Sequence, residues 1–194
     1  MESEKNRNST HLWYVGYGSN LCFERFHHYI CGGKFRLGGK RCTGCRDKTF
    51  LGLSKPFKIP HCLYFAKKAN GWKDGGVAFI SLKPEPDKNK YAYGRMWKVI
   101  EEQFFDIWKQ EGRGWYDKEV NLGQDNDGIP IVTITSGNKS ESNPPSDNYL
   151  KTMSIGLEET YHLDKKTTLE YLIEKPGIKD NMTNEKLLEI INSN

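Results

Sequence analysis

Tyr14-Val-Gly-Tyr-Gly-Ser-Asn20 is the stretch of sequence that decides the fold of this chain. The residues up to Tyr17 are aromatic and β-branched, the next three are typical of a turn, and residues 21–30 carry apolar side chains at helical spacing. The stretch therefore predicts a strand, a tight turn and a helix. Glycines and the free N–H groups of a first helical turn suit a bound carboxylate or a developing oxyanion. A turn whose serine or asparagine merely caps the helix is the alternative.

Further strands and helices follow this first unit. A helix over 101–111 ends at Gly112, and from Ser146 onward the apolar spacing becomes helical, with a break at Pro176-Gly177. We expect a mixed α+β fold, in which the sheet curls into a small barrel of about six or seven strands with helices packed outside. The strands are predicted at residues 12–17, 49–53, 63–67, 76–82, 91–99, 116–122 and 129–136, the last two joined as a hairpin through residues 124–128.

Length and composition limit the class of protein. At 194 residues the chain suits one domain over residues 11–194, with residues 1–10 as a disordered polar tail. The net charge of +4 is weak evidence for nucleic acid, and no segment approaches the length of a membrane span. Five cysteines in a chain of this length favour free thiols in a reducing compartment. We therefore expect a cytoplasmic protein with no membrane association.

Glu111 is the strongest candidate for a catalytic residue. It closes the predicted helix over 101–111, where the negative end of the helix dipole disfavours an ionised carboxylate and raises its pKa. Trp108 and Trp115 would raise the pKa further if they excluded water around the carboxyl group. A carboxyl tuned in this way can accept and return protons near neutral pH. The alternative is a glutamate that only favours the helix and keeps its head group in solvent.

Five segments, in order along the chain, resemble the γ-glutamylcyclotransferase family. They are Tyr14-Val-Gly-Tyr-Gly-Ser-Asn-Leu21, Trp72-Lys-Asp-Gly-Gly-Val-Ala78, Tyr93-Gly-Arg-Met-Trp-Lys98, Gln110-Glu-Gly112 and Pro145-Ser-Asp-Asn-Tyr149. Each motif alone is weak, and together they are specific. The resemblance runs from about residue 12 to residue 149. The chain is more basic and richer in cysteine than the family pattern between Cys31 and Cys62.

The resemblance implies an activity and a set of site residues. The substrate would be a γ-glutamyl amide, whose α-amine attacks its own γ-carbonyl to form 5-oxoproline and release a free amine. Neither a metal nor another cofactor is implied, and the protein would be a monomer or homodimer whose partner is this small molecule rather than nucleic acid. Glu111 would be the catalytic acid/base. The substrate-binding residues would be Tyr14, Val15, Gly16, Tyr17, Gly18, Ser19, Asn20 and Tyr149.

Other functions stay open at the level of the sequence. Cys31, Cys42, Cys45 and Cys62 could hold zinc in a basic nucleic-acid-binding module, although only one close cysteine pair is present. The domain could instead be a non-catalytic ligand-binding or interaction domain of the same fold, with a structural glutamate at 111. The basic side chains of Arg41, Arg46 and Lys48 either contact an acidic part of the substrate or belong to a solvated loop.

Overall fold

The computed structural model describes residues 10–138, 140–179 and 181–193, and these form two sheets with helices around them. The larger sheet is mixed, because β1 pairs antiparallel with β5 but parallel with β7. The mixed α+β architecture predicted from the sequence is confirmed. The larger sheet has the order β2 (Ser54–Ile59), β5 (Ala92–Ile100), β1 (His11–Gly16), β7 (Pro130–Thr135), β6 (Lys118–Gln124); β3 (Leu63–Ala69) and β4 (Gly75–Ile80) form the smaller sheet.

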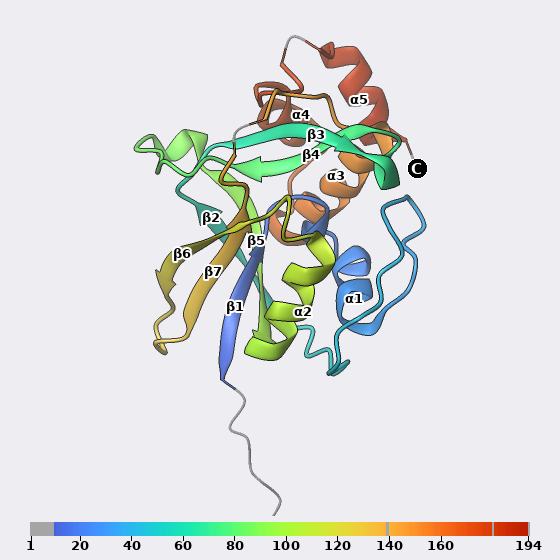
Figure 1. The fold of residues 1–194 in the computed structure, drawn as a ribbon. Helices are drawn as coiled ribbons and strands as arrows, with labels where there is room; N and C mark the ends of the chain where they lie inside the picture. Colours follow the sequence, from blue (N-terminus) through green and yellow to red (C-terminus); the bar gives the residue numbers. More distant parts are fainter. Residues whose placement is uncertain (1–9, 139, 180, 194) are drawn as a thin grey trace, which may run out of the picture.

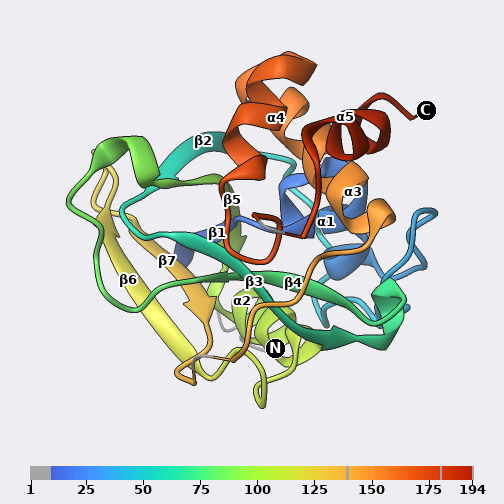
Figure 2. The ribbon, with the colours of Figure 1, turned by 90° about the horizontal axis from the view of Figure 1, so that it is seen from above.

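The side chain of Thr135 connects the two sheets. The β3–β4 hairpin lies across one end of the larger sheet (Figure 1) and passes over β1 in the view from above (Figure 2). Thr135 of β7 donates its hydroxyl to the backbone oxygen of Ile80 at 2.7 Å, and accepts from the Ile80 N–H at 3.1 Å. Both residues are buried. A buried threonine thus satisfies the strand edge of β4 where no backbone ladder continues.

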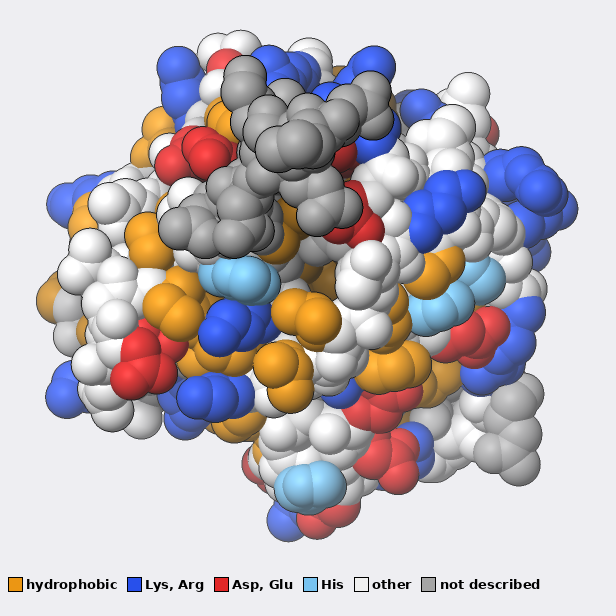
Figure 3. All heavy atoms as spheres, turned by 90° about the horizontal axis from the view of Figure 1, so that it is seen from below, with side chains coloured by type: hydrophobic (Ala, Val, Ile, Leu, Met, Phe, Trp, Pro, Cys, Tyr) orange, Lys and Arg blue, Asp and Glu red, His pale blue; other side chains and the backbone are white. Residues whose placement is uncertain are grey.

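The helices pack around these sheets. They are the short 3₁₀ turn η1 (Ser19–Leu21), α1 (Phe23–Cys31), α2 (Glu101–Glu111), α3 (Asp147–Tyr161), α4 (Lys165–Ile173) and α5 (Asn184–Asn192). The last three begin with side-chain caps, from Ser146, Asp164 and Thr183. No helix within the described part of the chain is long and apolar enough to cross a bilayer. The face of the molecule shown in Figure 3 intersperses basic, acidic and apolar side chains.

The strand predicted at residues 49–53 is wrong. The chain there is irregular, because Gln103 of α2 donates its side-chain amide to the backbone oxygens of Asp47 and Thr49. The strand begins instead at Ser54, where the chain pairs antiparallel with β5. That strand is polar and lies at the sheet edge, which is where a sheet tolerates Pro56. The tail predicted at residues 1–10 falls outside the described residues, apart from Thr10, whose backbone oxygen accepts from Glu101 N–H.

The turn after β1 is held by a close contact with α3. A Cβ atom at Gly156 would lie 2.4 Å from the Cβ of Leu21 and 2.5 Å from the backbone nitrogen of Cys22. We expect Gly156→Ala to lower the free energy of unfolding by about 2 kcal/mol, because rigid backbone must move to admit one methyl group. Urea denaturation measures the change. Gly114→Ala is the matched control, because its Cβ would enter open space; equal stability of both variants would contradict this packing.

Candidate active site

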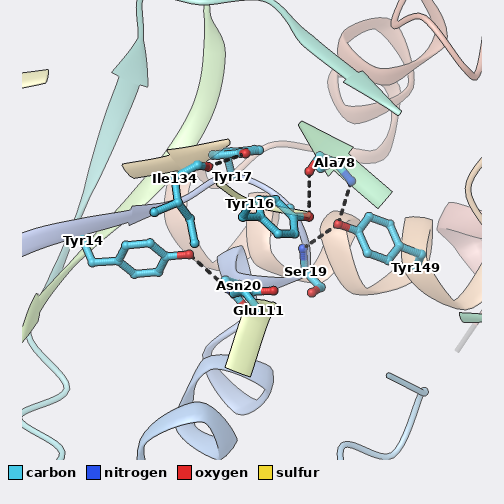
Figure 4. Close-up of a pocket in the computed structure, with 10 residues that line it drawn as sticks. Tyr14, Tyr17, Ser19, Asn20, Ala78, Glu111, Tyr116, Ile134 and Tyr149 are labelled. Atoms are coloured by element: carbon cyan, nitrogen blue, oxygen red, sulfur yellow. Dashed lines mark hydrogen bonds between the residues drawn. The ribbon is translucent and has the colours of Figure 1, made fainter. Parts of the chain in front are cut away.

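The strand–turn segment at the N-terminus lines a small polar pocket. Its walls come from five separate parts of the chain, so the pocket exists only in the folded protein (Figure 4). The lining residues are Tyr14, Tyr17, Gly18, Ser19, Asn20, Ala78, Glu111, Tyr116, Ile134 and Tyr149. Of the residues predicted to bind substrate, Val15 and Gly16 do not line it. Val15 is fully buried in the core. A Cβ atom added at Gly16 would lie 2.7 Å from the Cβ of Asn20.

The structure places Glu111 beside Asn20, which lies 91 positions earlier in the chain. The side-chain amide of Asn20 donates one hydrogen to Glu111 Oε1 at 2.5 Å and another to the Tyr14 hydroxyl at 3.3 Å. Asn20 is itself held by its backbone oxygen, which accepts from the Trp97 indole at 3.0 Å. The carboxyl group is therefore oriented by a buried amide rather than free in solvent.

Burial raises the pKa of the Glu111 carboxyl above its ordinary value, and this is the largest influence on it. The charge of Arg25 and the hydrogen bonds from Asn20 and Tyr29 oppose the shift without reversing it. The shift has the direction that the sequence predicts, but burial rather than the helix end is its largest cause, and the aromatic neighbours differ from those expected. Tyrosines line the pocket, whereas Trp115 is exposed and the indole of Trp108 donates to the backbone oxygen of Tyr116.

Tyr149 presents at the pocket a hydroxyl hydrogen that has no acceptor among the residues the structure describes. Its oxygen accepts from the backbone N–H of Ser19 at 3.4 Å and of Ala78 at 3.1 Å (Figure 4). Burial raises the pKa of Tyr149 to about 12, so the hydroxyl stays protonated at neutral pH. With both acceptor positions filled, the hydroxyl group can still donate its own hydrogen. The N–H groups of residues 19 and 78 thus polarise the Tyr149 hydroxyl toward the pocket.

The pocket also holds an unpaired acceptor. Asn20 Oδ1 is buried and has no hydrogen-bond partner among the residues that the structure describes. A buried carbonyl oxygen without a partner is costly unless a ligand or water supplies a hydrogen. Because the amide nitrogen of Asn20 is committed to Glu111 and Tyr14, this oxygen is available to an N–H group of a bound molecule.

A much larger cleft adjoins the pocket. Its volume is about 1190 Å³, and Glu111 and Tyr116 line both spaces. Three sequence segments form most of its wall: residues 40–46 after α1, residues 68–72 at the β3–β4 turn, and residues 105–116 at the end of α2. Arg25 and Tyr29 of α1 complete it. The carboxyl group of Glu111 therefore lies between a confined polar pocket and an open cleft.

Sequence reasoning did not assign five residues to this site, namely Arg25, Tyr29, Ala78, Tyr116 and Ile134. Tyr29 and Arg25 lie on one face of α1, four residues apart, and both influence the pKa of Glu111. Tyr116 donates its hydroxyl to the backbone oxygen of Ala78 at 3.0 Å, which fixes β4 against the pocket. The four-residue spacing of Arg25 and Tyr29 places both on one face of a helix, and sequence analysis could have used this signal. The positions of residues 78 and 116 depend on long-range packing and left no local signal.

The thiols proposed as zinc ligands have separate partners. Cys42 accepts from Arg25, Cys45 contacts the backbone oxygen of Tyr29, and Cys62 contacts Glu85. Within the described ranges, no group of three or more His, Cys, Asp or Glu side chains is arranged to hold a metal ion. The geometry therefore gives the zinc-module hypothesis no support.

Comparisons with known proteins agree on the fold. No protein-family model matches the chain. The chain superposes on a solved structure named γ-glutamyl cyclotransferase with a TM-score of 0.58 and 23% identity, covering 93% of this chain and 98% of that one. An uncharacterized Homo sapiens protein gives the same TM-score and identity, with 94% and 99% coverage. The Bacillus subtilis protein YkqA gives a TM-score of 0.54 at 16% identity, covering 86% and 55%.

One curated relative is similar in sequence. The chain is 27% identical over 208 residues to "Histone deacetylase 5" of Arabidopsis thaliana, covering 85% of this chain and 31% of that protein. The chain thus spans about a third of that relative's length. The resemblance inferred from the motifs is confirmed at the level of the fold: this is a protein with the γ-glutamyl cyclotransferase fold. At these identities the likeness defines the architecture, and the reaction has to be argued from the site.

Proposed function

We propose that the protein is a γ-glutamylcyclotransferase that converts a γ-glutamyl amide into 5-oxoproline and a free amine. The observation that carries the proposal is the contact between Asn20 and Glu111, which sets a carboxyl group of raised pKa in a polar pocket. The fold shared with proteins of that name supports it. A non-catalytic binding domain would have no need of a carboxyl group of raised pKa beside an unpaired acceptor.

The first step needs a base for the α-ammonium group of the substrate. Glu111 in its ionised form accepts a proton from the ammonium, and Asn20 Oδ1 accepts a second N–H, so that the amine is held in one orientation. The amine nitrogen then bonds to the γ-carbonyl carbon within the same molecule. Confinement in the pocket brings the two atoms together before reaction, which lowers the entropic part of the barrier.

The second step needs stabilisation of an oxyanion and an acid for the leaving nitrogen. The Tyr149 hydroxyl, polarised by the N–H groups of Ser19 and Ala78, donates to the carbonyl oxygen as its charge develops. The bond between the γ-carbon and the amide nitrogen breaks as Glu111 returns its proton to that nitrogen. The carboxylate then takes the excess proton that the attacking nitrogen still carries and passes it to the released amine, which leaves as an ammonium ion. One carboxyl group thus serves both nitrogens, and the lactam and the amine leave with no net proton change at the glutamate.

The proposal predicts an acid limb in the pH profile. Glu111 must be ionised to begin the reaction, so kcat/KM falls as the pH drops through its pKa. Because burial raises that pKa above the ordinary value of 4.5, we expect the midpoint of the limb above pH 4.5. Initial rates of amine release between pH 4 and 8 measure it. A midpoint at or below the ordinary value would show that a different group is titrating.

Detection of 5-oxoproline tests the proposal directly. The protein is incubated with γ-glutamylalanine and with α-glutamylalanine, and products are separated by liquid chromatography with mass detection. We expect 5-oxoproline and alanine from the γ-linked isomer alone, because in the α-linked isomer cyclisation would not release alanine. Absence of product from every γ-glutamyl amide tried would leave the non-catalytic binding domain as the function of this fold.

A further inference from the structure

The cleft beside the active-site pocket is surrounded by basic side chains. Its lining contains seven cationic residues and two acidic ones. Within the described part of the chain, Arg46 is the one of these cations paired with a carboxylate, at 3.0 Å from Asp106. The cationic residues are Arg25, Lys40, Arg41, Arg46, Lys68, Lys109 and Arg113, and the acidic ones are Asp106 and Glu111. Like charges gathered around a cleft create a positive potential that attracts anions.

The cations occupy two depths in the cleft. Arg25 is buried, with 3% of its surface exposed, and its guanidinium contacts Cys42 and the Tyr29 hydroxyl rather than a carboxylate. Its Nε atom is buried without a partner among the residues described. The remaining basic residues are exposed at the rim. Arg25 thus donates to no carboxylate within the described residues, and Glu111 is the acidic side chain whose charge acts on it from nearby. An anion bound in the cleft would add a second favourable charge.

The cleft has apolar walls between these charges. Trp72 is buried, Trp115 and Phe105 are exposed, and all three line the space. At about 1190 Å³ the cleft exceeds what a single amino acid fills. A ligand that matches it is therefore longer than one residue, with negative groups for the rim and some apolar or backbone surface for the aromatic walls.

The position of Glu111 indicates which part of the proposed γ-glutamyl substrate enters this cleft. The carboxyl group lies at the junction, so a γ-glutamyl group held in the pocket directs its amide nitrogen outward, into the basic space. We infer that the amine released belongs to a short acidic peptide, one that carries two or more carboxylate or phosphate groups. This inference rests on the proposed function and adds the class of leaving group. Of the basic residues that the sequence singled out, Arg41 and Arg46 line the cleft, and Lys48 does not.

A matched panel of substrates tests the inference. The wild-type protein is assayed for 5-oxoproline with γ-glutamyl-alanyl-alanine, γ-glutamyl-lysyl-lysine, γ-glutamyl-glutamyl-glutamate and γ-glutamyl-phosphoseryl-alanine. We expect kcat/KM for the acidic tripeptide to exceed that for the neutral one by roughly tenfold, since two exposed ion pairs form. The preference falls as salt is added. The phosphoseryl arm shows whether phosphate or carboxylate is the better anion.

Two double variants locate the preference in the cleft. Arg41→Glu with Lys68→Glu reverses two rim charges, and Lys88→Glu with Lys118→Glu makes the same change in net charge outside the cleft. We expect the ratio of acidic to neutral kcat/KM to collapse by roughly tenfold in the first variant and to persist in the second. Circular dichroism verifies that both fold.

The outcomes separate this inference from the proposed function. Equal turnover of the neutral and acidic tripeptides, or a preference that survives in the Arg41/Lys68 variant, overturns the inference and leaves the proposed function intact. If no substrate yields 5-oxoproline, the proposed function fails. Calorimetric binding of glutamyl-glutamate, the released half, then still tests the cleft: affinity that the Arg41/Lys68 variant loses supports an acidic peptide, and absence of binding overturns it.

Discussion

The Glu111→Gln variant is expected to lose 5-oxoproline formation by roughly 10³-fold, the range in which a positioned general acid/base contributes. The amide cannot accept the ammonium proton or return it to the leaving nitrogen. Its oxygen can still accept from the Asn20 side chain, so the pocket geometry is retained. Progress curves with γ-glutamylalanine measure the loss. Glu119→Gln, an exposed glutamate on β6, is the control for the chemical change alone.

The same variant is expected to keep its fold. Because burial raises the pKa of Glu111, its ionised form is less favourable in the folded chain than in the unfolded chain. The wild-type protein therefore loses stability as the pH rises from the ordinary glutamate value through the raised one, and Glu111→Gln lacks this loss. Denaturation midpoints at pH 4 and pH 8 show the difference. Wild-type turnover in a well-folded Glu111→Gln variant would contradict the proposed acid/base role of Glu111.

Gly18→Ala is expected to lower turnover by roughly 100-fold, as a displacement of about 1 Å in a catalytic group does. A Cβ atom there would lie 2.4 Å from the Tyr149 hydroxyl oxygen and 3.0 Å from the Cβ of Ala78. The tyrosine has to move, and the hydroxyl that receives the Ser19 and Ala78 N–H groups leaves its place. Steady-state kinetics with a γ-glutamyl amide measure the effect.

A control variant separates the effect of Gly18→Ala on the pocket from its effect on the stability of the fold. Gly114→Ala adds the same methyl group in open space and is expected to retain its stability. Thermal melts of both variants are compared with the wild type. Turnover of Gly18→Ala within threefold of wild type would mean that Tyr149 does not position the substrate.

Local signals in the sequence were enough to predict much of the fold. The helix α2 begins and ends at the residues predicted from its apolar spacing and the glycine that follows it. The β6–β7 hairpin is antiparallel, as the polar loop between its strands indicated. The edge strand β2 was misplaced, because its polar sequence resembles a loop and its pairing is set by β5. The parallel pairing of β1 with β7 depends on contacts more than 110 residues apart, which no local pattern records.

The candidate site, like the fold, could be predicted only in part from the sequence. The strand–turn stretch and Glu111 could be singled out because both lie in segments that resemble the motifs of the γ-glutamylcyclotransferase family. Arg25 and Tyr29, which act on the pKa of the carboxyl group, come from α1, and Tyr116, which lines the pocket, comes from the loop after α2; only folding brings them together. The basic cleft was visible in the sequence as charge between residues 40 and 46, but its partners at residues 68, 109 and 113 were not.

Cyclisation of the substrate by its own amine, in place of attack by water, is the central claim, and an isotope experiment tests it most directly. The protein is incubated with γ-glutamylalanine in water enriched in ¹⁸O, and the masses of the products are measured by mass spectrometry. We predict unlabelled 5-oxoproline together with alanine. Glutamate carrying ¹⁸O in its γ-carboxyl group would contradict the account, because it would show that water, and not the substrate's amine, attacks the carbonyl.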